Sequence, residues 1–263
     1  MKTTTASSLS AMKANGEKFA VITAYDFTFS KLIENAAIEV VLVGDSLGNV
    51  IQGRDSTIPV TVDEMAYHTE AVKRGNERAL LITDMPFMSY ATEAQALENA
   101  AVLMQAGAQM VKLEGGEWLA DTVHLLTERG IPVCGHVGLT PQSVHKLGGY
   151  KIQGKEQQAA AQMIADAKAL ESAGAELIVV ECVPSSLGRE LSEAVDIPVI
   201  GIGAGPDTDA QVLVLQDMLG ISQRLPSFSK NFLDESSGIE EAITAYGNAV
   251  RSGSFPGPEH CFK

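Results

Sequence analysis

Six short apolar runs in this 263-residue chain end in a side chain that can carry charge or transfer a proton. The residues at these ends are Asp26, Asp45, Asp84, Glu114, His136 and Glu181. Continuous apolar runs are typical of parallel strands that are buried on both faces. When such strands close into a barrel, their carboxyl ends lie on one rim, which is where active sites form on this fold. The sequence therefore predicts that side chains far apart in the chain converge on one site.

Three of these residues, Asp45, Asp84 and Glu114, are carboxylates that we expect to lie close together. Each one alone is equally well explained as a helix N-cap or a loop acid. Three carboxylates on one rim would repel one another unless a hard cation lay between them. Ligation by oxygen alone favours Mg²⁺ over zinc, with Mn²⁺ or Co²⁺ as substitutes. The sequence therefore predicts a divalent cation at this rim.

Lys112 and Glu181 are the candidates for binding and proton transfer. Lys112 lies two residues before Glu114, so in a strand both side chains point to the barrel interior. The buried ammonium needs an anion, either Glu114 or a substrate carboxylate, and we favour the substrate. Burial would raise the pKa of Glu181 toward that of a general base, although a fourth metal ligand or a cap is the alternative. His136 is a candidate acid, substrate hydrogen-bond donor or loop histidine, and the sequence leaves these open.

Eight strands are expected to position these residues. They are predicted at residues 19–24, 39–43, 79–83, 109–113, 131–135, 176–180, 197–202 and 212–215. The eighth is the least distinct, because the whole stretch 212–219 is equally compatible with a helix. Helices separate the strands; a capping box of Thr92 and Gln95 opens one, and Gly107 ends it. The alternation of strand and helix predicts a parallel α/β fold.

Two of the strand-helix units resemble each other in sequence. Residues 106–114 (AGAQMVKLE) align with 173–181 (AGAELIVVE), and 131–136 (IPVCGH) align with 197–202 (IPVIGI). Such a duplication is expected of a (β/α)8 barrel rather than an open sheet. It places Glu114 and Glu181 at matching strand ends.

Length and composition limit the remaining possibilities. About 250 residues form one (β/α)8 barrel, and no Pro- or Ser-rich linker divides this chain, so we predict one domain over residues 1–263. It begins with a short helix and becomes less regular after about Leu225, with a final helix near 239–250. The net charge of −14 and the pI of about 4.7 argue against a nucleic-acid partner. The absence of a signal-peptide pattern or an apolar run of about 18 residues predicts a cytoplasmic protein with no membrane segment.

Cysteines and glycine-rich runs add little chemistry of their own. Cys134, Cys182 and Cys261 form no C-x-x-C pair, and the first two fall in strand-like runs, where buried inert thiols are expected. The glycines of GDSLG (44–48) and GIGAG (201–205) allow backbone amides to approach an anion. The second run lacks the spacing and the later acidic residue of a dinucleotide fingerprint, so a Rossmann fold is a weak alternative.

Motifs along nearly the whole chain resemble those of the ketopantoate hydroxymethyltransferase (3-methyl-2-oxobutanoate hydroxymethyltransferase) family. The motifs are TAYD (23–26), GDSLG (44–48), DSTIPVTVDEMAYHT (55–69), DMPFMSY (84–90), VKLEGG (111–116), GHVGLTPQS (135–143), GGYKIQG (148–154), ECVP (181–184) and PVIGIGAG (198–205). The resemblance implies a single (β/α)8 TIM barrel of the phosphoenolpyruvate/pyruvate type. It loosens after Leu219, where ISQRLPSFSKNF replaces a Gly-rich stretch and Ser227 stands where lysine is common.

The resemblance also implies a role for each site residue. Mg²⁺, one per subunit, would be bound by Asp45, Asp84 and Glu114. The substrate would be bound by Asp45, Ser46, Asp84 and Lys112, and Glu181 would accept the proton. Members of the family form large homo-oligomers, commonly decamers.

The implied reaction is the first committed step of pantothenate synthesis. In that reaction Mg²⁺ would polarise the carbonyl of 3-methyl-2-oxobutanoate, Glu181 would take the C3 proton, and the enolate would attack the methylene carbon delivered by 5,10-methylenetetrahydrofolate, with water completing the hydroxymethyl transfer. One alternative is a lyase or mutase of the phosphoenolpyruvate/pyruvate group, which would form no ketopantoate. A second is a binding protein that keeps the metal but has lost turnover, although intact Glu181 and Lys112 argue against it.

Overall fold

The chain folds as a closed barrel of eight parallel strands, described for residues 3–263 by a computed structural model. The strands pair in sequence order, and β8 closes the barrel against β1. They are β1 Phe19–Thr23, β2 Val40–Val43, β3 Leu80–Asp84, β4 Met110–Glu114, β5 Val133–Gly138, β6 Leu177–Glu181, β7 Val199–Ile202 and β8 Ala210–Leu213. The predicted (β/α)8 barrel is confirmed.

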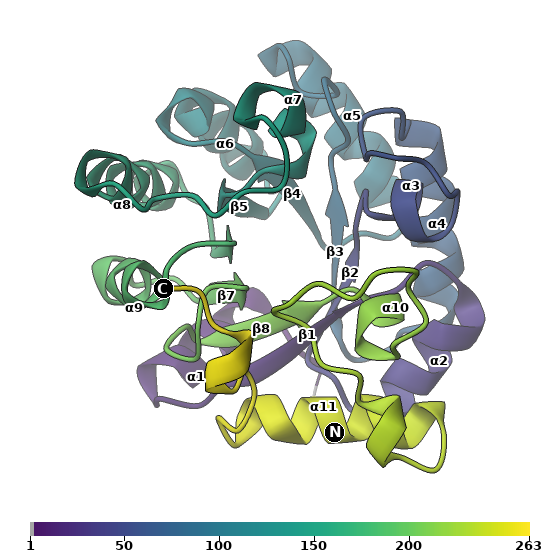
Figure 1. Ribbon diagram of the computed structural model, residues 1–263. Coiled ribbons are helices and arrows are strands. Elements are labelled where there is room, and N and C mark those ends of the chain that lie inside the picture. The colour runs from purple at the N-terminus through teal and green to yellow at the C-terminus, as the bar shows by residue number, and fades with distance from the viewer. Residues whose placement is uncertain (1–2) are drawn as a thin grey trace.

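Helices surround the strands as an outer ring (Figure 1). The longer ones are α1 Ala6–Ala14, α2 Phe27–Asn35, α4 Val62–Gly75, α5 Glu93–Gln105, α6 Ala120–Glu128, α8 Gln157–Ser172, α9 Ser185–Ala194 and α11 Ile239–Arg251. Four-residue helices α3 Leu47–Val50, α7 Val144–Leu147 and α10 Leu215–Met218 lie between them, with 3₁₀ turns η1 Glu117–Leu119, η2 Pro141–Ser143, η3 Leu233–Glu235 and η4 Pro258–His260. The ambiguous stretch 212–219 therefore divides between the end of β8 and α10.

The core has two layers because successive strand residues point to opposite faces. In β1, Val21 belongs to the cluster inside the barrel and Ile22 to the cluster between strands and helices. Both clusters are mostly aliphatic, as the composition predicts. Cys134 lies in the inner layer, where burial raises the pKa of its thiol to about 12, and Cys182 is also buried. Both thiols are therefore protonated at neutral pH, as predicted.

Helix α1 covers the amino-terminal end of the barrel. Its Leu9 is fully buried in the inner cluster. Lys13 Nζ donates to three carbonyl oxygens within residues 192–197 at 2.8–2.9 Å and lies 3.0 Å from Asp209 Oδ2. These partners precede β7 and β8, so α1 is fixed at the end of the barrel opposite the predicted site.

Helix α11 holds the C-terminal region against the barrel wall. Tyr246, which is fully buried, donates its hydroxyl to the carbonyl oxygens of Val21 in β1 and Gln211 in β8 at 2.9 and 2.8 Å. The predicted final helix is confirmed. Within residues 3–263, none of the helices combines the length and apolar character that crossing a bilayer would require.

Candidate active site

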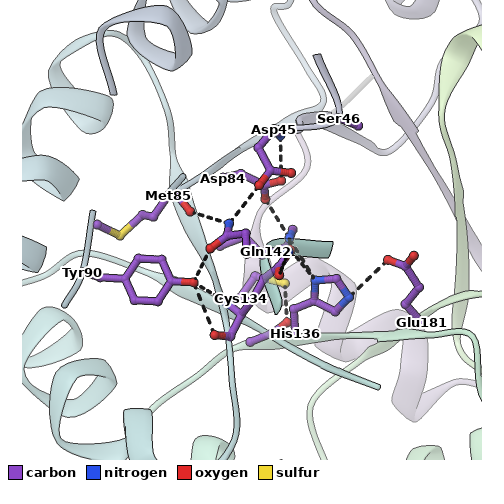
Figure 2. A network of polar contacts seen from close by, with 12 residues as sticks. Asp45, Ser46, Asp84, Met85, Tyr90, Cys134, His136, Gln142 and Glu181 are labelled. Atoms are coloured by element: carbon purple, nitrogen blue, oxygen red, sulfur yellow. Dashed lines mark hydrogen bonds and ion pairs between the residues drawn. The ribbon is translucent and has the colours of Figure 1, made fainter. Parts of the chain in front are cut away.

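Apart from Asp26, the residues predicted at the strand ends lie around one cavity of about 1710 Å³. Asp84, Glu114 and Glu181 are the last residues of β3, β4 and β6, and Asp45 follows β2. Asp45, Asp84 and Glu114, here called the carboxylate cluster, are each 3–5% exposed. Figure 2 shows Asp45 and Asp84 close together, with Gln142 beside them. The cavity therefore has a buried acidic floor.

Strand register explains why the charged side chains meet. Asp84 of β3 is the register partner of Lys112 in β4, and Glu114 of β4 is the partner of His136 in β5. Partners on adjacent strands lie about 5 Å apart and point to the same face. Lys112 Nζ accordingly lies 2.8 Å from Asp84 Oδ1, and His136 Nδ1 lies 3.4 Å from Glu114 Oε1. The four residues form one continuous polar row.

The carboxylate cluster carries more negative charge than its surroundings neutralise. Burial, reinforced by the neighbouring carboxylates, raises the pKa of Asp45 well above its ordinary range. Burial raises the pKa of Glu114 to about 7, with Lys112 opposing the shift. Although burial disfavours its charged form, Asp84 and Glu114 keep the pKa of Lys112 above its usual value, so it stays an ammonium. One cation faces three carboxylates, and the cluster needs either protons or a further cation.

Both oxygens of Asp84 are in contact with neighbouring groups. Its Oδ2 accepts a hydrogen bond from the Asp45 backbone N–H at 3.0 Å. Its buried Oδ1 forms an ion pair with Lys112 Nζ at 2.8 Å and has no other polar partner among residues 3–263. A cation that binds to Asp84 would therefore share this carboxylate with Lys112.

A network built on Gln142 orients the carboxylate cluster. Gln142 Nε2 donates to Asp45 Oδ2 and to the Met85 carbonyl, both at 2.9 Å, and its backbone N–H donates to Glu114 Oε2 at 3.0 Å. Its Oε1 accepts from the Tyr90 hydroxyl at 2.6 Å. Figure 2 shows the Gln142 side chain between Asp45 and Tyr90. Such fully bonded partners fix the direction in which charged groups point.

His136 connects the row to Glu181. An ammonium can only donate, so His136 Nδ1 accepts from Lys112 Nζ at 3.1 Å. Burial lowers the pKa of His136, so the ring is neutral and its one proton lies on Nε2. Nε2 faces Glu181 Oε2 at 3.3 Å. Burial raises the pKa of Glu181, and the neighbouring His136 opposes this shift. The Glu181 side chain is 14% exposed, more than the side chains of the carboxylate cluster.

Ser46 completes the predicted set. It lies at the start of α3, makes no capping hydrogen bond, and its Oγ lies 2.8 Å from the Tyr25 hydroxyl. Ser46 lines the same cavity as Lys112 and Glu181. The structure thus brings together Asp45, Ser46, Asp84, Lys112, Glu114 and Glu181, the whole set predicted from the sequence.

Comparison with known proteins identifies the family. A sequence profile of the family described as ketopantoate hydroxymethyltransferase matches residues 3–258. The chain belongs to the ketopantoate hydroxymethyltransferase family. It is 59% identical to 3-methyl-2-oxobutanoate hydroxymethyltransferase of Colwellia psychrerythraea, covering 100% of this chain and 99% of that one. The Cronobacter sakazakii protein of the same name is 58% identical, with 100% of both chains covered. The chain is therefore an enzyme of the hydroxymethyltransferase class.

Solved structures agree with the fold of this ketopantoate hydroxymethyltransferase family member. A 2,3-dimethylmalate lyase of the PEP mutase/isocitrate lyase superfamily has a TM-score of 0.58 at 15% identity, covering 95% of this chain and 100% of that one. A phosphonopyruvate hydrolase in complex with oxalate and Mg²⁺ has a TM-score of 0.61 at 14% identity, with 80% of each chain covered. These solved structures therefore share the overall fold of this chain.

Some features of this family member differ from the interpretation of its sequence. Asp26, grouped with the reactive strand ends, caps α2 by accepting from the Phe29 backbone N–H. Gly48 serves packing, because a Cβ there would lie 2.8 Å from Val60 Cγ2. Gly203 has a φ of +60° and begins the segment 203–209, which joins β7 directly to β8. The structure thus gives Asp26 a capping role, Gly48 a packing role and Gly203 a conformational role.

The ligand set for Mg²⁺ stays a prediction. In the part of the chain that the structure describes, no three histidine, cysteine, aspartate or glutamate side chains are arranged so that they already surround an ion. Lys112 Nζ lies between Asp84 Oδ1 at 2.8 Å and Glu114 Oε1 at 3.9 Å. The donor chemistry nevertheless suits a hard cation, because the cluster offers only oxygen ligands and an excess of negative charge.

The metal-free protein is expected to lose about 1–2 kcal/mol of stability as the pH rises from 6.5 to 8.0. The pKa of Glu114, about 7 when folded, is near 4.3 in an unfolded chain, and that of Asp45 is raised in the same sense. The folded state then binds more protons than the unfolded state, so the free energy of unfolding falls with rising pH. His136 has the opposite effect, but only below its unfolded pKa of about 6.5. Urea unfolding in EDTA measures the free energy of unfolding at each pH. A free energy that rises between pH 6.5 and 8.0 would contradict the prediction, and Glu114→Gln should make the dependence on pH weaker.

Replacing Gln142 with leucine is expected to destabilise the metal-free protein by about 2–4 kcal/mol. The change leaves Asp45 Oδ2, the Met85 carbonyl and the Tyr90 hydroxyl without their amide partner. Urea unfolding compares this variant with Gln158→Leu, which changes an exposed residue of α8. Equal stability of the two variants would mean that the network contributes nothing.

Proposed function

We propose that this enzyme transfers a hydroxymethyl group from 5,10-methylenetetrahydrofolate to 3-methyl-2-oxobutanoate, giving 2-dehydropantoate and tetrahydrofolate, as the first step of pantothenate synthesis. The observation that carries the proposal is a buried excess of carboxylates beside one ammonium, with Glu181 at its more exposed edge. Such a site suits an anionic oxo acid bound with a cation and next to a base. The homo-oligomer implied by the resemblance remains a prediction.

Mg²⁺ is the proposed cofactor, held by Asp45, Asp84 and Glu114. The oxygen-only donor set and the uncompensated charge support it. Mg²⁺ commonly uses one or two carboxylates and completes its shell with water and substrate, so a closed cage of protein ligands is not required. When bound, the ion supplies Lewis-acid polarisation of the keto group. A structural neighbour described with oxalate and Mg²⁺ is consistent with this pairing on the same fold.

Lys112 and Ser46 are the proposed contacts for the oxo acid, together with Asp45 and Asp84. Lys112 is held charged in a buried row, so its ammonium attracts the substrate carboxylate and the negative charge that develops on the keto oxygen. The Ser46 hydroxyl, beside Tyr25, can donate to the same anion. These groups would orient C3 of the substrate toward Glu181.

Glu181 is the proposed general base. Burial raises its pKa toward the range in which a carboxylate removes a proton near neutral pH. The C3–H electrons become the C2–C3 double bond of the enolate, and the proton moves to Glu181. C3 then forms a bond to the methylene carbon delivered by the donor, and both bonds from that carbon to the folate nitrogens break. Water supplies the oxygen of the new hydroxymethyl group and its two protons pass to the nitrogens, and the new alkoxide takes back the proton held by Glu181. His136 Nε2, 3.3 Å away, is placed to hold the carboxylate in position.

A turnover assay with both substrates tests this function directly. Ketopantoate formation, followed by mass spectrometry, is expected with Mg²⁺, lost in EDTA and restored by added Mg²⁺. Exchange of the C3 proton with solvent deuterium is expected without the folate donor. A lyase or mutase would form no ketopantoate, and activity unaffected by EDTA would contradict the metal-dependent mechanism.

A further inference from the structure

The cavity is far larger than a small oxo acid needs. Its volume of about 1710 Å³ exceeds the roughly 300–1,000 Å³ of common small-molecule pockets. The carboxylate cluster forms only its buried floor. Two segments, residues 150–155 and 221–228, contribute much of the remaining wall, and most of their lining residues are exposed or half-buried. The outer part of the cavity therefore has room for a second, longer molecule.

Three exposed cations line this outer part, here called the mouth. They are Lys151 and Lys155, between α7 and α8, and Arg224, after α10. Across residues 3–263, none of the three side chains has a carboxylate within 4.0 Å or makes a hydrogen bond. The exposed acid among the described lining residues is Asp55, and the neighbouring Arg54 is already paired with Glu64 at 3.0 Å. The mouth thus carries a local excess of unpaired positive charge.

This excess is opposite in sign to the rest of the molecule. The chain has 33 acidic and 19 basic residues and a net charge of −14, so its overall field repels anions. A positive rim on a cleft offsets such a field locally and attracts an anionic ligand. Arg224 also lies in the stretch that departs from the family pattern, near Ser227, and both residues line the cavity. Position 227 lacks the lysine that is common in the family, but Arg224 still places a cation on this segment.

The chemistry of the donor fixes which end faces the mouth. The transferable methylene carbon of 5,10-methylenetetrahydrofolate is carried on nitrogens at the pterin end, and the glutamate carboxylates lie at the opposite end. The acceptor carbon is at the floor, so the pterin end must reach inward and the tail must point outward. We propose that Lys151, Lys155 and Arg224 form a binding site for the carboxylates of the donor's glutamate tail. This inference rests on the proposed function.

The test compares donors with one and five glutamates. The five-glutamate donor is expected to have a KM about tenfold lower at low ionic strength, as two or three exposed ion pairs allow. The advantage should shrink in 0.5 M salt, where exposed charges are screened. In the triple variant Lys151→Ser/Lys155→Ser/Arg224→Ser, the ratio of the two KM values should fall to about one.

A matched triple variant controls for net charge. Lys73→Ser/Arg129→Ser/Lys168→Ser also removes three exposed cations, none of which lines the cavity, and should keep the tenfold ratio. The proposal would be overturned if the ratio of the two KM values were near one in the wild type. It would also be overturned if the mouth variant kept the tenfold ratio, or if the control variant lost it to the same extent. Exchange of the C3 proton without folate tests the proposed function separately. If the wild type exchanges the C3 proton and forms ketopantoate but has a KM ratio of one, the proposed function stands and only the proposed tail site is wrong.

Discussion

Glu181→Gln is expected to slow exchange of the substrate C3 proton by about 10²–10⁴-fold and to reduce ketopantoate formation equally. Glutamine keeps the size of the side chain and can still contact His136, but it cannot accept the proton. Because Glu181 lies outside the carboxylate cluster, the affinity for Mg²⁺ should change little. Proton exchange followed by NMR in deuterated buffer, with calorimetry for Mg²⁺, separates the two effects.

An exposed glutamate provides the control for this variant. Glu190→Gln in α9 removes the same charge at the surface and should exchange the proton at the wild-type rate. Exchange at that rate by Glu181→Gln would exclude Glu181 as the base.

Asp84→Asn is expected to weaken Mg²⁺ binding by about 100-fold or more and to abolish both proton exchange and transfer. Changes to groups that only orient metal ligands commonly cost about 10–100-fold in affinity, so loss of a proposed ligand should cost at least as much. The variant also removes the anion closest to Lys112, whose ammonium is otherwise 2.8 Å from Asp84 Oδ1. Calorimetric titration of the metal-free protein with Mg²⁺ measures the affinity without relying on activity.

The comparison variant for Asp84→Asn is Asp121→Asn, at an exposed position in the first turn of α6. It should bind Mg²⁺ as the wild type does. Unchanged Mg²⁺ affinity in Asp84→Asn would remove Asp84 from the ligand set. Together with Glu181→Gln, this variant distinguishes loss of the metal from loss of the base.

The barrel could be predicted from the sequence because its strands are buried on both faces. Seven apolar runs agree with strands to within one to three residues at each end, and the duplicated segments do end in Glu114 and Glu181 at equivalent positions. The stretch 212–219 could not be divided in advance. It is apolar almost throughout, so its pattern does not distinguish a strand from a helix. The structure ends β8 at Leu213 and starts α10 at Leu215.

The members of the site could be predicted, but most of their contacts could not. The strand pattern places Lys112 and Glu114 on one face, and it predicts either Glu114 or, preferably, a substrate carboxylate as the anion of Lys112. The closer anion is Asp84, because strand register places it opposite Lys112. Register between strands far apart in sequence leaves no local pattern, and the contact of His136 with Glu181 was missed for the same reason.

Gln142 and Tyr90 were missed altogether. Both are neutral and lie in loops that follow β5 and β3, so nothing in the strand-end pattern selects them. Their role depends on loop conformations that bring Gln142 between the two carboxylates, with its side-chain amide on Asp45 and its backbone N–H on Glu114. The motifs DMPFMSY and GHVGLTPQS contain them, but a motif alone does not say which of its residues are bonded to one another.

The position of α1 has a consequence for the order of events during turnover. With Leu9 and Lys13 blocking the far end of the barrel, molecules reach the acidic floor from the side of the strand carboxyl ends. In the proposed reaction, the five-carbon acid must bind before the larger folate donor fills the passage above it, and the product must stay until the spent donor has left. For that reaction, steady-state kinetics should be sequential and ordered, with tetrahydrofolate released first.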